Sequence, residues 1–237
     1  LADKFLTFAR QSIDTSISID WQKELSQIIQ VSISEFKAPM NAAAMVIERR
    51  TGDVKAYVGS SAYSEIDRKG AVNYLTAVRS PGSTLKPLIY ATALQRGFIK
   101  PNHVYQDKVF HQNGYTPTNF DGNWTGEVTL KDALIRSLNI PAIETLDMLG
   151  PEEFEKNLRS FFGKEIGHGK EAGLSLAAGG FYMSAENLAD LYVELADPGH
   201  EGKISFLKDE ITSANSFLIN QKTSSKILSL LSQNDRL

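Results

Sequence analysis

The sequence predicts an α+β domain, because strand patterns joined by a turn occur once, near residues 43–59, while helix patterns occur before and after them. The 237 residues, 42% of them hydrophobic, are enough for one well-packed core. A two-stranded hairpin is marginal by itself, and two strands are few for this many helices. We therefore expect further strands beyond residue 237.

Charge and composition exclude several classes of function. The net charge of -3 gives no broad basic surface, which excludes nucleic acid as the main partner. No apolar run reaches about 18 residues and no signal-peptide pattern occurs; since the chain begins with leucine, we expect it to be part of a longer protein. Without cysteine there is no disulfide or thiolate chemistry. The histidines show no metal-ligand spacing; they are His103, His111, His168 and His200.

An amphipathic helix is expected before the hairpin. Asp20 is a suitable N-cap for a helix that begins at Trp21, and apolar residues at helical spacing continue it. Pro39 is expected to end it, because proline lacks the amide hydrogen that a helix interior needs. We assign residues 1–39 to a linker and helix segment, and residues 40–237 to the main domain.

The hairpin itself is predicted from two strand patterns and a turn. Residues 43–50 and 54–59 have strand composition, and residues 51–53, Thr-Gly-Asp, have the residue types of a hairpin turn. The polar segment 60–74 is expected to be a loop.

A Pro81-Gly82 break follows, and then an apolar helix. Residues 86–95 are rich in helix formers, and Gly97 is a natural stop. Ser83 is therefore expected at or just before the first turn of this helix.

The rest of the chain is predicted as helices separated by loops. Residues 103–127 are rich in Gly, Pro, Asn and Asp, and are expected to form a long irregular segment of a kind that is often functional. A glycine-rich loop is expected at residues 163–180. Capping residues, prolines and glycines place the helices at residues 129–136, 141–150, 151–162, 184–196 and 223–232.

Ser83 and Lys86 have the spacing of a nucleophile and its base. A serine hydroxyl is a weak nucleophile near neutral pH and needs a base within hydrogen-bond distance. A lysine three residues further along a helix lies on the same face, and it serves as that base when desolvation lowers its pKa. The preceding turn places the serine at a helix N-terminus, where free amide groups favour developing negative charge.

Spacing alone does not select this pair, because Ser-x-x-Lys also begins at Ser34 and Ser205. Both of those lie in polar stretches and are interpreted as solvated surface. The plainer interpretation of the selected pair, with Ser83 as a simple N-cap and Lys86 as a surface lysine, stays open at this point.

Longer strings around these residues resemble the transpeptidase domain of bifunctional (class A) penicillin-binding proteins, and within that class the C-type subgroup. Residues 79–87, Arg-Ser-Pro-Gly-Ser-Thr-Leu-Lys-Pro, match the family's nucleophile segment, and residues 134–142, Leu-Ile-Arg-Ser-Leu-Asn-Ile-Pro-Ala, match its second motif. Residues 115–120 and 175–180 resemble a loop before that motif and a later glycine-rich stretch. The resemblance covers roughly residues 40–232 and implies the penicillin-binding fold, an antiparallel sheet with flanking helices.

The resemblance implies acyl transfer through a serine ester, without metal or cofactor. Ser83 would attack the carbonyl of the penultimate D-alanine of a peptidoglycan stem peptide, and Lys86 would take its proton. Ser137 would relay a proton to the leaving D-alanine, while Asn139 would bind the substrate amide and Lys86. An amine of a neighbouring stem would resolve the acyl-enzyme, and β-lactams would acylate Ser83 as substrate mimics.

The same resemblance implies a location. The longer protein is expected to be anchored in the bacterial cytoplasmic membrane, with this domain on its periplasmic or other extracytoplasmic side. Other cell-wall proteins are expected partners.

The sequence departs from the family in one respect. The third motif, Lys-Thr-Gly on a sheet strand, is absent, and the nearest string, Lys-Thr-Ser at residues 222–224, is interpreted as a chance match next to a helix. One oxyanion donor belongs to that strand in the family. We therefore expect the domain to be incomplete at its C-terminus, and inactive or slow by itself.

Two other functions stay open from the sequence. A serine β-lactamase or β-lactam sensor shares the fold and differs in deacylation, although no Glu-x-x-x-Asn-type loop stands out. An inactive scaffold with a vestigial site is the second alternative. In that case Ser137 and Asn139 would only close one helix and open the next.

Overall fold

The structure, a computed structural model, describes residues 13–36, 40–112, 114–162, 166, 171–197, 203–208 and 219–232. The chain forms two compact units, Leu1–Ala77 with Gly202–Ser213, and Val78–Glu201 with Ala214–Leu237. Among the described residues the first unit contains one helix and a two-stranded antiparallel sheet, and the second contains several helices and another such sheet, which confirms the predicted α+β class. The predicted boundary between residues 39 and 40 stays a prediction.

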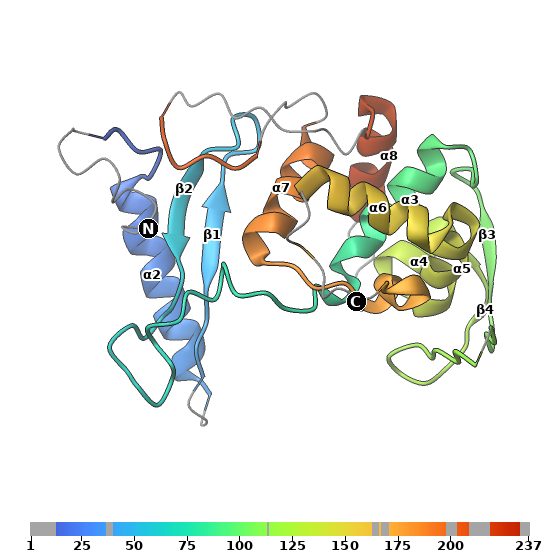
Figure 1. The fold of residues 1–237 in the computed structure, drawn as a ribbon, viewed down its shortest axis with the longest axis horizontal. Coiled ribbons are helices and arrows are strands. Elements are labelled where there is room, and N and C mark those ends of the chain that lie inside the picture. The colour runs from blue at the N-terminus through green and yellow to red at the C-terminus, as the bar shows by residue number, and fades with distance from the viewer. Residues whose placement is uncertain are drawn as a thin grey trace. The chain divides into compact units, whose positions relative to one another are not determined.

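In the first unit a helix covers the predicted hairpin (Figure 1). Helix α2 (Ile19–Ser34) packs against strand β2 (Val54–Val58), which pairs antiparallel with β1 (Ala44–Ile47). The Gln22 side chain donates to the Tyr57 carbonyl over 3.1 Å and accepts from the Tyr57 amide over 2.7 Å. These paired bonds fix the helix to the strand, and the predicted hairpin is confirmed.

The start of the first helix differs from its prediction. The helix begins at Ile19 with Ser18 at the N-cap, so Asp20 lies in the first turn rather than at the cap. A carboxylate in the first turn is favourable because a helix N-terminus carries partial positive charge. Pro39, which is predicted to end the helix, lies outside the described residues.

Two further segments join the hairpin. The Ser16 hydroxyl lies 2.9 Å from the Val54 carbonyl oxygen and 3.1 Å from that of Ser205, and shares its hydrogen between them. Phe206 packs edge-on against Tyr57, with ring centroids 5.2 Å apart. Ser205, one of the competing Ser-x-x-Lys serines, is buried, so its interpretation as solvated surface is wrong and it belongs to the packing of this unit.

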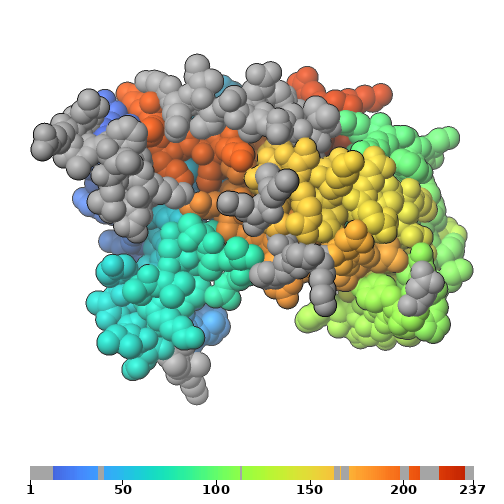
Figure 2. All heavy atoms as spheres, in the orientation of Figure 1, coloured from blue at the N-terminus to red at the C-terminus, as the bar shows by residue number. Residues whose placement is uncertain are grey.

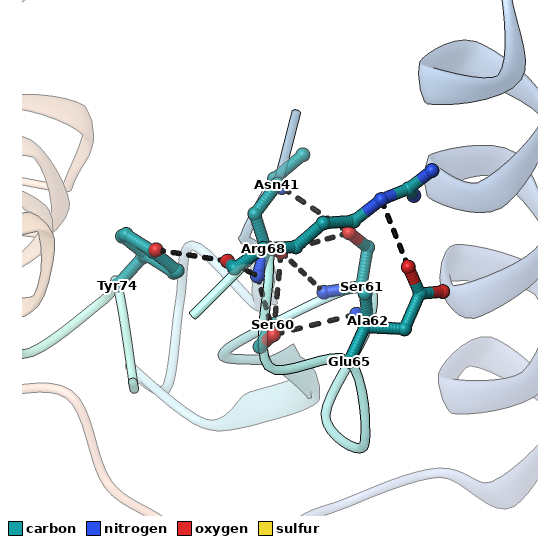
Figure 3. A network of polar contacts seen from close by, with 8 residues as sticks. Asn41, Ser60, Ser61, Ala62, Glu65, Arg68 and Tyr74 are labelled. Carbon is teal, nitrogen blue, oxygen red and sulfur yellow. Dashed lines mark hydrogen bonds and ion pairs between the residues drawn. The ribbon is translucent and has the colours of Figure 1, made fainter. Parts of the chain in front are cut away.

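One asparagine holds the polar loop that follows β2 (Figure 3). Asn41 Oδ1 accepts from the Ser61 amide (2.9 Å) and the Ser61 hydroxyl (2.8 Å). Its Nδ2 donates to the Arg68 carbonyl (3.1 Å) and to the Ser60 hydroxyl (2.9 Å), while Arg68 pairs with Glu65 over 2.9 Å. The segment predicted as a loop is thus a loop fastened at several points.

The core of the second unit forms around α3 (Lys86–Gln95), whose bounds match the prediction. Seven of its ten residues are buried, from the first residue to Ala93. Helix α5 (Asn139–Leu149) packs against it, and the 3-10 helix η3 (Gly173–Ala178) packs against α5. A helix buried on all sides has no polar face, which explains the nearly continuous apolar sequence of α3.

Four more α-helices are described in this unit, close to their predicted positions. The capping box at Thr129 and the cap at Ser184 are confirmed, and each serves the first turn of its helix. Gly150 ends α5 with φ of 80°, as predicted. Part of the surface of α6 (Pro151–Phe162) is exposed and appears in yellow in Figure 2. The four helices are α4 (Leu130–Ile135), α6 (Pro151–Phe162), α7 (Ala185–Ala196) and α8 (Gln221–Leu231).

The segment predicted as irregular, residues 103–127, contains one strand and the first half of its partner. Strand β3 (Val104–Asp107) pairs antiparallel with β4 (Gly126–Thr129). Burial alternates along β3, with Tyr105 and Asp107 buried, but four residues give too short a pattern to recognise among so many turn-forming neighbours. The 3-10 helix η3 likewise lies inside the segment predicted as a glycine-rich loop.

Candidate functional site

A tight turn presents Ser83 ahead of α3. The 3-10 helix η2 (Gly82–Leu85) forms this turn, and Gly82 begins it with φ of 57°, a conformation that favours glycine. The Thr84 hydroxyl donates to the Pro81 carbonyl over 2.6 Å, and the Tyr192 hydroxyl of α7 donates to the Thr84 carbonyl over 2.9 Å. The turn is therefore fixed both from within and by a neighbouring helix.

The chain ahead of α7 closes on the same turn. The Ser80 hydroxyl donates to the Gly179 carbonyl over 2.7 Å, and Arg79 bridges Met183 through two backbone bonds of 2.9 and 3.0 Å. Gly179 has φ of 99°, and a Cβ there would lie 2.7 Å from Gly82. Only glycine fits this approach, so the predicted glycine-rich stretch lies directly against the turn that carries Ser83.

Ser83 and Lys86 both line a cavity of about 820 Å³, together with Ser137. Ser83 is exposed, and no described residue forms a hydrogen bond with its hydroxyl. The Lys86 backbone amide donates to the Ser83 carbonyl, so one helical turn joins the two residues. The structure therefore brings three of the four predicted site residues to one cavity.

The Lys86 ammonium lies among three acceptors from the second motif. Nζ donates to the Ser137 carbonyl over 2.6 Å and to Asn139 Oδ1 over 2.7 Å, and lies 3.3 Å from the Ser137 hydroxyl. An ammonium has three donors, so these contacts occupy all of them. With 1% of its surface exposed, Lys86 is not the surface lysine of the plainer interpretation.

Burial lowers the pKa of Lys86 from its usual 10.5 to about 8, because desolvation disfavours the charged form. No carboxylate among the described residues forms an ion pair with it, so no opposite charge offsets that cost. At pH 7 about one molecule in ten then carries a neutral Lys86 amine, which is able to accept a proton.

Ser137 owes its place to a strained backbone. Its φ is 55°, a left-handed conformation that is costly for a residue with a side chain and persists only where the surroundings hold it. It separates α4 from α5, and its amide donates to the Leu134 carbonyl over 3.2 Å. This kink turns the Ser137 carbonyl and hydroxyl to Lys86 and starts α5 at Asn139.

Two residues that sequence reasoning did not single out stand behind Asn139. Asn119 Oδ1 accepts from the Asn139 amide over 2.8 Å, and Asn119 Nδ2 donates to both carboxylate oxygens of Asp107, over 2.8 and 3.0 Å. Asn119 lies 12 residues from Asp107 and 20 residues from Asn139. Helix and strand periodicity does not predict contacts at such separations. Only the family-like loop at residues 115–120 carried a signal.

The competing Ser-x-x-Lys patterns belong to the first unit and show ordinary local contacts. The Ser34 hydroxyl donates to the Val31 carbonyl within α2 over 2.7 Å, and Lys37 lies outside the described residues. The Ser205 hydroxyl donates to the Leu207 carbonyl over 2.9 Å.

The Lys-Thr-Ser string forms the first turn of α8. The Asn220 side chain caps that helix by accepting from the Thr223 amide over 2.9 Å. The Ser224 hydroxyl donates to the Leu195 carbonyl of α7. These contacts are helix capping and helix packing.

The described part of the chain holds no group of three or more His, Cys, Asp or Glu side chains placed to bind a metal ion. His168 and His200 lie outside it. Nor does any described helix combine the length and apolar character needed to cross a bilayer.

Known proteins match this chain over most of its length. The family described as the penicillin binding protein transpeptidase domain matches residues 42–234. Penicillin-binding protein 1C of Escherichia coli K12 is 32% identical over 199 residues, which are 84% of this chain and 26% of that protein. Penicillin-binding protein 1F of Bacillus subtilis 168 is 40% identical over 139 residues, 58% of this chain and 18% of that protein. The chain thus spans about a quarter or less of the length of these relatives.

Solved structures share the fold. Penicillin-binding protein PonA1 from Mycobacterium tuberculosis superposes with a TM-score of 0.77 at 17% identity, over 97% of this chain and 66% of that one. The transpeptidase domain of penicillin-binding protein 3 from Burkholderia pseudomallei gives a TM-score of 0.74 at 20% identity, over 92% and 69%. The predicted penicillin-binding fold is confirmed.

Proposed function

The chain belongs to the penicillin-binding protein transpeptidase domain family, and we propose that it forms the core of a serine-type peptidoglycan D,D-transpeptidase. One observation carries this proposal. The buried Lys86 amine, one helical turn from the exposed Ser83, donates to Ser137 and Asn139. A serine nucleophile needs a base that a small side-chain rotation can bring to it, and this desolvated amine lines the same cavity as the accessible Ser83 hydroxyl.

Acylation begins when neutral Lys86 takes the hydroxyl proton of Ser83. The Ser83 Oγ then bonds to the carbonyl carbon of the penultimate D-alanine. The amide C–N bond breaks, and the D-alanine amine leaves with a proton relayed from Lys86 through the Ser137 hydroxyl. The lowered pKa of Lys86 supports this role, because a base whose pKa lies near the working pH transfers protons most effectively.

Asn139 serves the lysine and the substrate together. Its Oδ1 accepts from Lys86, and one hydrogen of its Nδ2 donates to the Thr118 carbonyl over 2.7 Å. The other Nδ2 hydrogen has no partner within the described ranges and is available to a substrate carbonyl. An amine of a second stem peptide then attacks the Ser83 ester and forms the cross-link. A β-lactam acylates Ser83 by the same first step.

The location follows from the substrate. Peptidoglycan is cross-linked outside the cytoplasmic membrane, so we place this domain on the extracytoplasmic side, in a longer membrane-anchored protein. Peptidoglycan stem peptides and β-lactams are its proposed ligands, with other cell-wall proteins as further partners.

A fluorescent penicillin tests the proposal. The full-length protein that carries this chain should become covalently labelled, and Ser83→Ala should abolish the label. Ser34→Ala is the matched control, since Ser34 also begins a Ser-x-x-Lys pattern but bonds only within α2. Undiminished labelling of the Ser83→Ala protein would contradict the proposal.

The same assay separates a transpeptidase from a β-lactamase. A penicilloyl adduct that persists for many minutes is expected of a transpeptidase, whereas rapid loss of the label would indicate hydrolysis. Because the sequence holds no Lys-Thr-Gly, the isolated chain should acylate about a hundredfold more slowly than the full-length protein, the typical effect of one missing oxyanion donor.

A further inference from the structure

We propose that Asp107 and Asn119 are positioning residues of this site, a buried carboxylate–amide pair that sets the start of α5 and thereby holds Asn139 against Lys86. The inference rests on the proposed function for its catalytic meaning, although its contacts stand by themselves. Neither residue touches the cavity that Ser83 and Lys86 line.

Asp107 is a buried anion held by amides alone. It is fully buried at the end of β3, and its carboxylate accepts from Asn119 Nδ2 and from the Thr125 amide, the latter over 2.8 Å. None of the lysines and arginines in the described residues pairs with it. Burying a carboxylate is costly unless hydrogen bonds compensate, so every donor to it is tightly constrained.

The carboxylate fixes which way the Asn119 amide points. Asn119 is 4% exposed, and its Nδ2 donates to Asp107 and to the Asn123 carbonyl (2.9 Å). Rotating the amide by half a turn would put its oxygen against the carboxylate, which would then keep only the Thr125 amide as a donor. Asp107 therefore forces Asn119 Oδ1 to face the Asn139 amide.

Asn119 takes the place of a helix cap. The N-cap position of α5 is Leu138, whose side chain has no hydrogen-bond acceptor. Amide groups in a first helical turn have no partner within the helix and are costly to bury unsatisfied. Asn119 Oδ1 satisfies the first of them, the Asn139 amide, over 2.8 Å.

The neighbouring residue in the same loop orients the Asn139 side chain. Asn139 Nδ2 donates to the carbonyl of that residue, Thr118, over 2.7 Å, which leaves Asn139 Oδ1 directed at Lys86 Nζ. Residues 118 and 119 thus fix both the main chain and the side chain of Asn139. Their own place is fixed by Asp107.

The test exchanges the two side chains in the full-length protein. Asn119→Ala should slow acylation by penicillin by about tenfold or more, the effect of losing one or two buried hydrogen bonds. Asn119→Asp should do at least as much harm, because it sets two carboxylates against each other. The double variant Asp107→Asn with Asn119→Asp restores one donor and one anion, and should recover to within about threefold of wild type.

Asn123→Ala is the matched control. Asn123 lies in the same loop, but its side chain is exposed and bonds only to Asp121. Its acylation rate should stay within about twofold of wild type. If Asn119→Ala acylates as fast as Asn123→Ala, or if the exchanged pair recovers no better than Asn119→Asp, the positioning role is wrong. Should Asn119→Ala fail to fold, the exchanged pair decides by the same criterion.

A second readout needs no reaction at Ser83. In protein labelled with ¹³C-lysine, the pKa of Lys86 should move in Asn119→Ala and stay unchanged in Asn123→Ala, because the amine exchanges its Asn139 acceptor for water once Asn139 loosens. The charged groups lining the same cavity, Lys131, Asp132 and Arg136, are identical in both variants. An unmoved Lys86 pKa in Asn119→Ala overturns this inference, whereas a wild-type protein that is not acylated at Ser83 overturns the proposed function.

Discussion

Two loops of this protein are each fastened by one asparagine, and they differ in what that asparagine holds. In the first unit, half-buried Asn41 bonds the hydroxyls of Ser60 and Ser61 together with backbone groups. In the second unit, buried Asn119 bonds a buried carboxylate, Asp107, and the amide that opens α5.

We therefore expect that Asn41 can be replaced at little cost in stability, whereas Asn119 cannot. Hydroxyls at a half-exposed site lose little when a partner is removed, since water takes its place. A buried carboxylate has no such replacement, so removing its donor leaves it uncompensated. The loop that stands behind the Lys86 site is thus the one that tolerates least change.

The largest effect on acylation is expected from substituting Lys86, the residue that Asn119 serves by positioning Asn139. Lys86→Met removes the base while keeping an unbranched side chain, and should slow acylation by about a thousandfold, within the range of one general base. Thermal unfolding should change little, because the loss of three hydrogen bonds is offset by removing a buried charge. Lys222→Met, at an exposed position of α8, is the control and should acylate normally. More than a tenth of the wild-type rate in Lys86→Met would contradict the assignment.

Two lysines sharpen the comparison through pH. Desolvation lowers the pKa of Lys86 to about 8, whereas the hydrogen bond to Asp53 raises the pKa of Lys55 in the first unit. Acylation should therefore rise by roughly tenfold per pH unit below pH 8 and level off above it. A rate that is flat between pH 6 and 8 would argue against Lys86 as the base.

Stability should follow the same two pKa shifts with opposite signs. The folded protein binds fewer protons at Lys86 than the unfolded chain between about pH 8 and 10.5, so this residue's destabilising effect is complete below that window and is relieved as pH rises through it. Lys55 contributes stability below pH 10.5 that is lost as pH rises through its raised pKa. Urea titrations of Lys86→Met and Lys55→Met against wild type separate the two contributions.

The two asparagines are compared directly by alanine substitution. Asn119→Ala should lower the free energy of unfolding by about 2–3 kcal/mol, since a buried carboxylate and a helix amide both lose a partner. Asn41→Ala should lower it by about 1 kcal/mol, and should leave acylation unchanged. Equal losses in chemical denaturation would remove the distinction between the two loops.

The smallest effect is expected at Tyr90, in the core of the second unit. Its hydroxyl is buried without a hydrogen-bond partner among the described residues. Tyr90→Phe should therefore be neutral or stabilising by up to about 1 kcal/mol. A clear loss of stability would show that the hydroxyl has a partner after all.

Sequence predicted best where local chemistry decides the structure. The bounds of α3, α6 and α7 follow from a proline or cap at the start and a change in composition at the end. Strands β3 and β4 were not predicted, because each depends on pairing with the other across a long loop rather than on its own four residues.

The candidate site divides along the same line. Ser83 and Lys86 are one helical turn apart, so their relation could be predicted from spacing. Ser137 and Asn139 were predicted through family resemblance, including the contact of Asn139 with Lys86. Spacing alone could not have joined them to a lysine 51 and 53 residues away. No sequence pattern marks Asp107, because its role depends on a hydrogen bond from Asn119, which lies 12 residues further along the chain.

The most direct test of the account is to locate the acyl group by peptide mass mapping after the full-length protein has reacted with penicillin. We expect a single penicilloyl adduct, on the peptide that contains Ser83, which forms faster as the pH approaches 8 and is absent in Lys86→Met. An adduct on any other residue, or undiminished acylation of Ser83 in Lys86→Met, would contradict it.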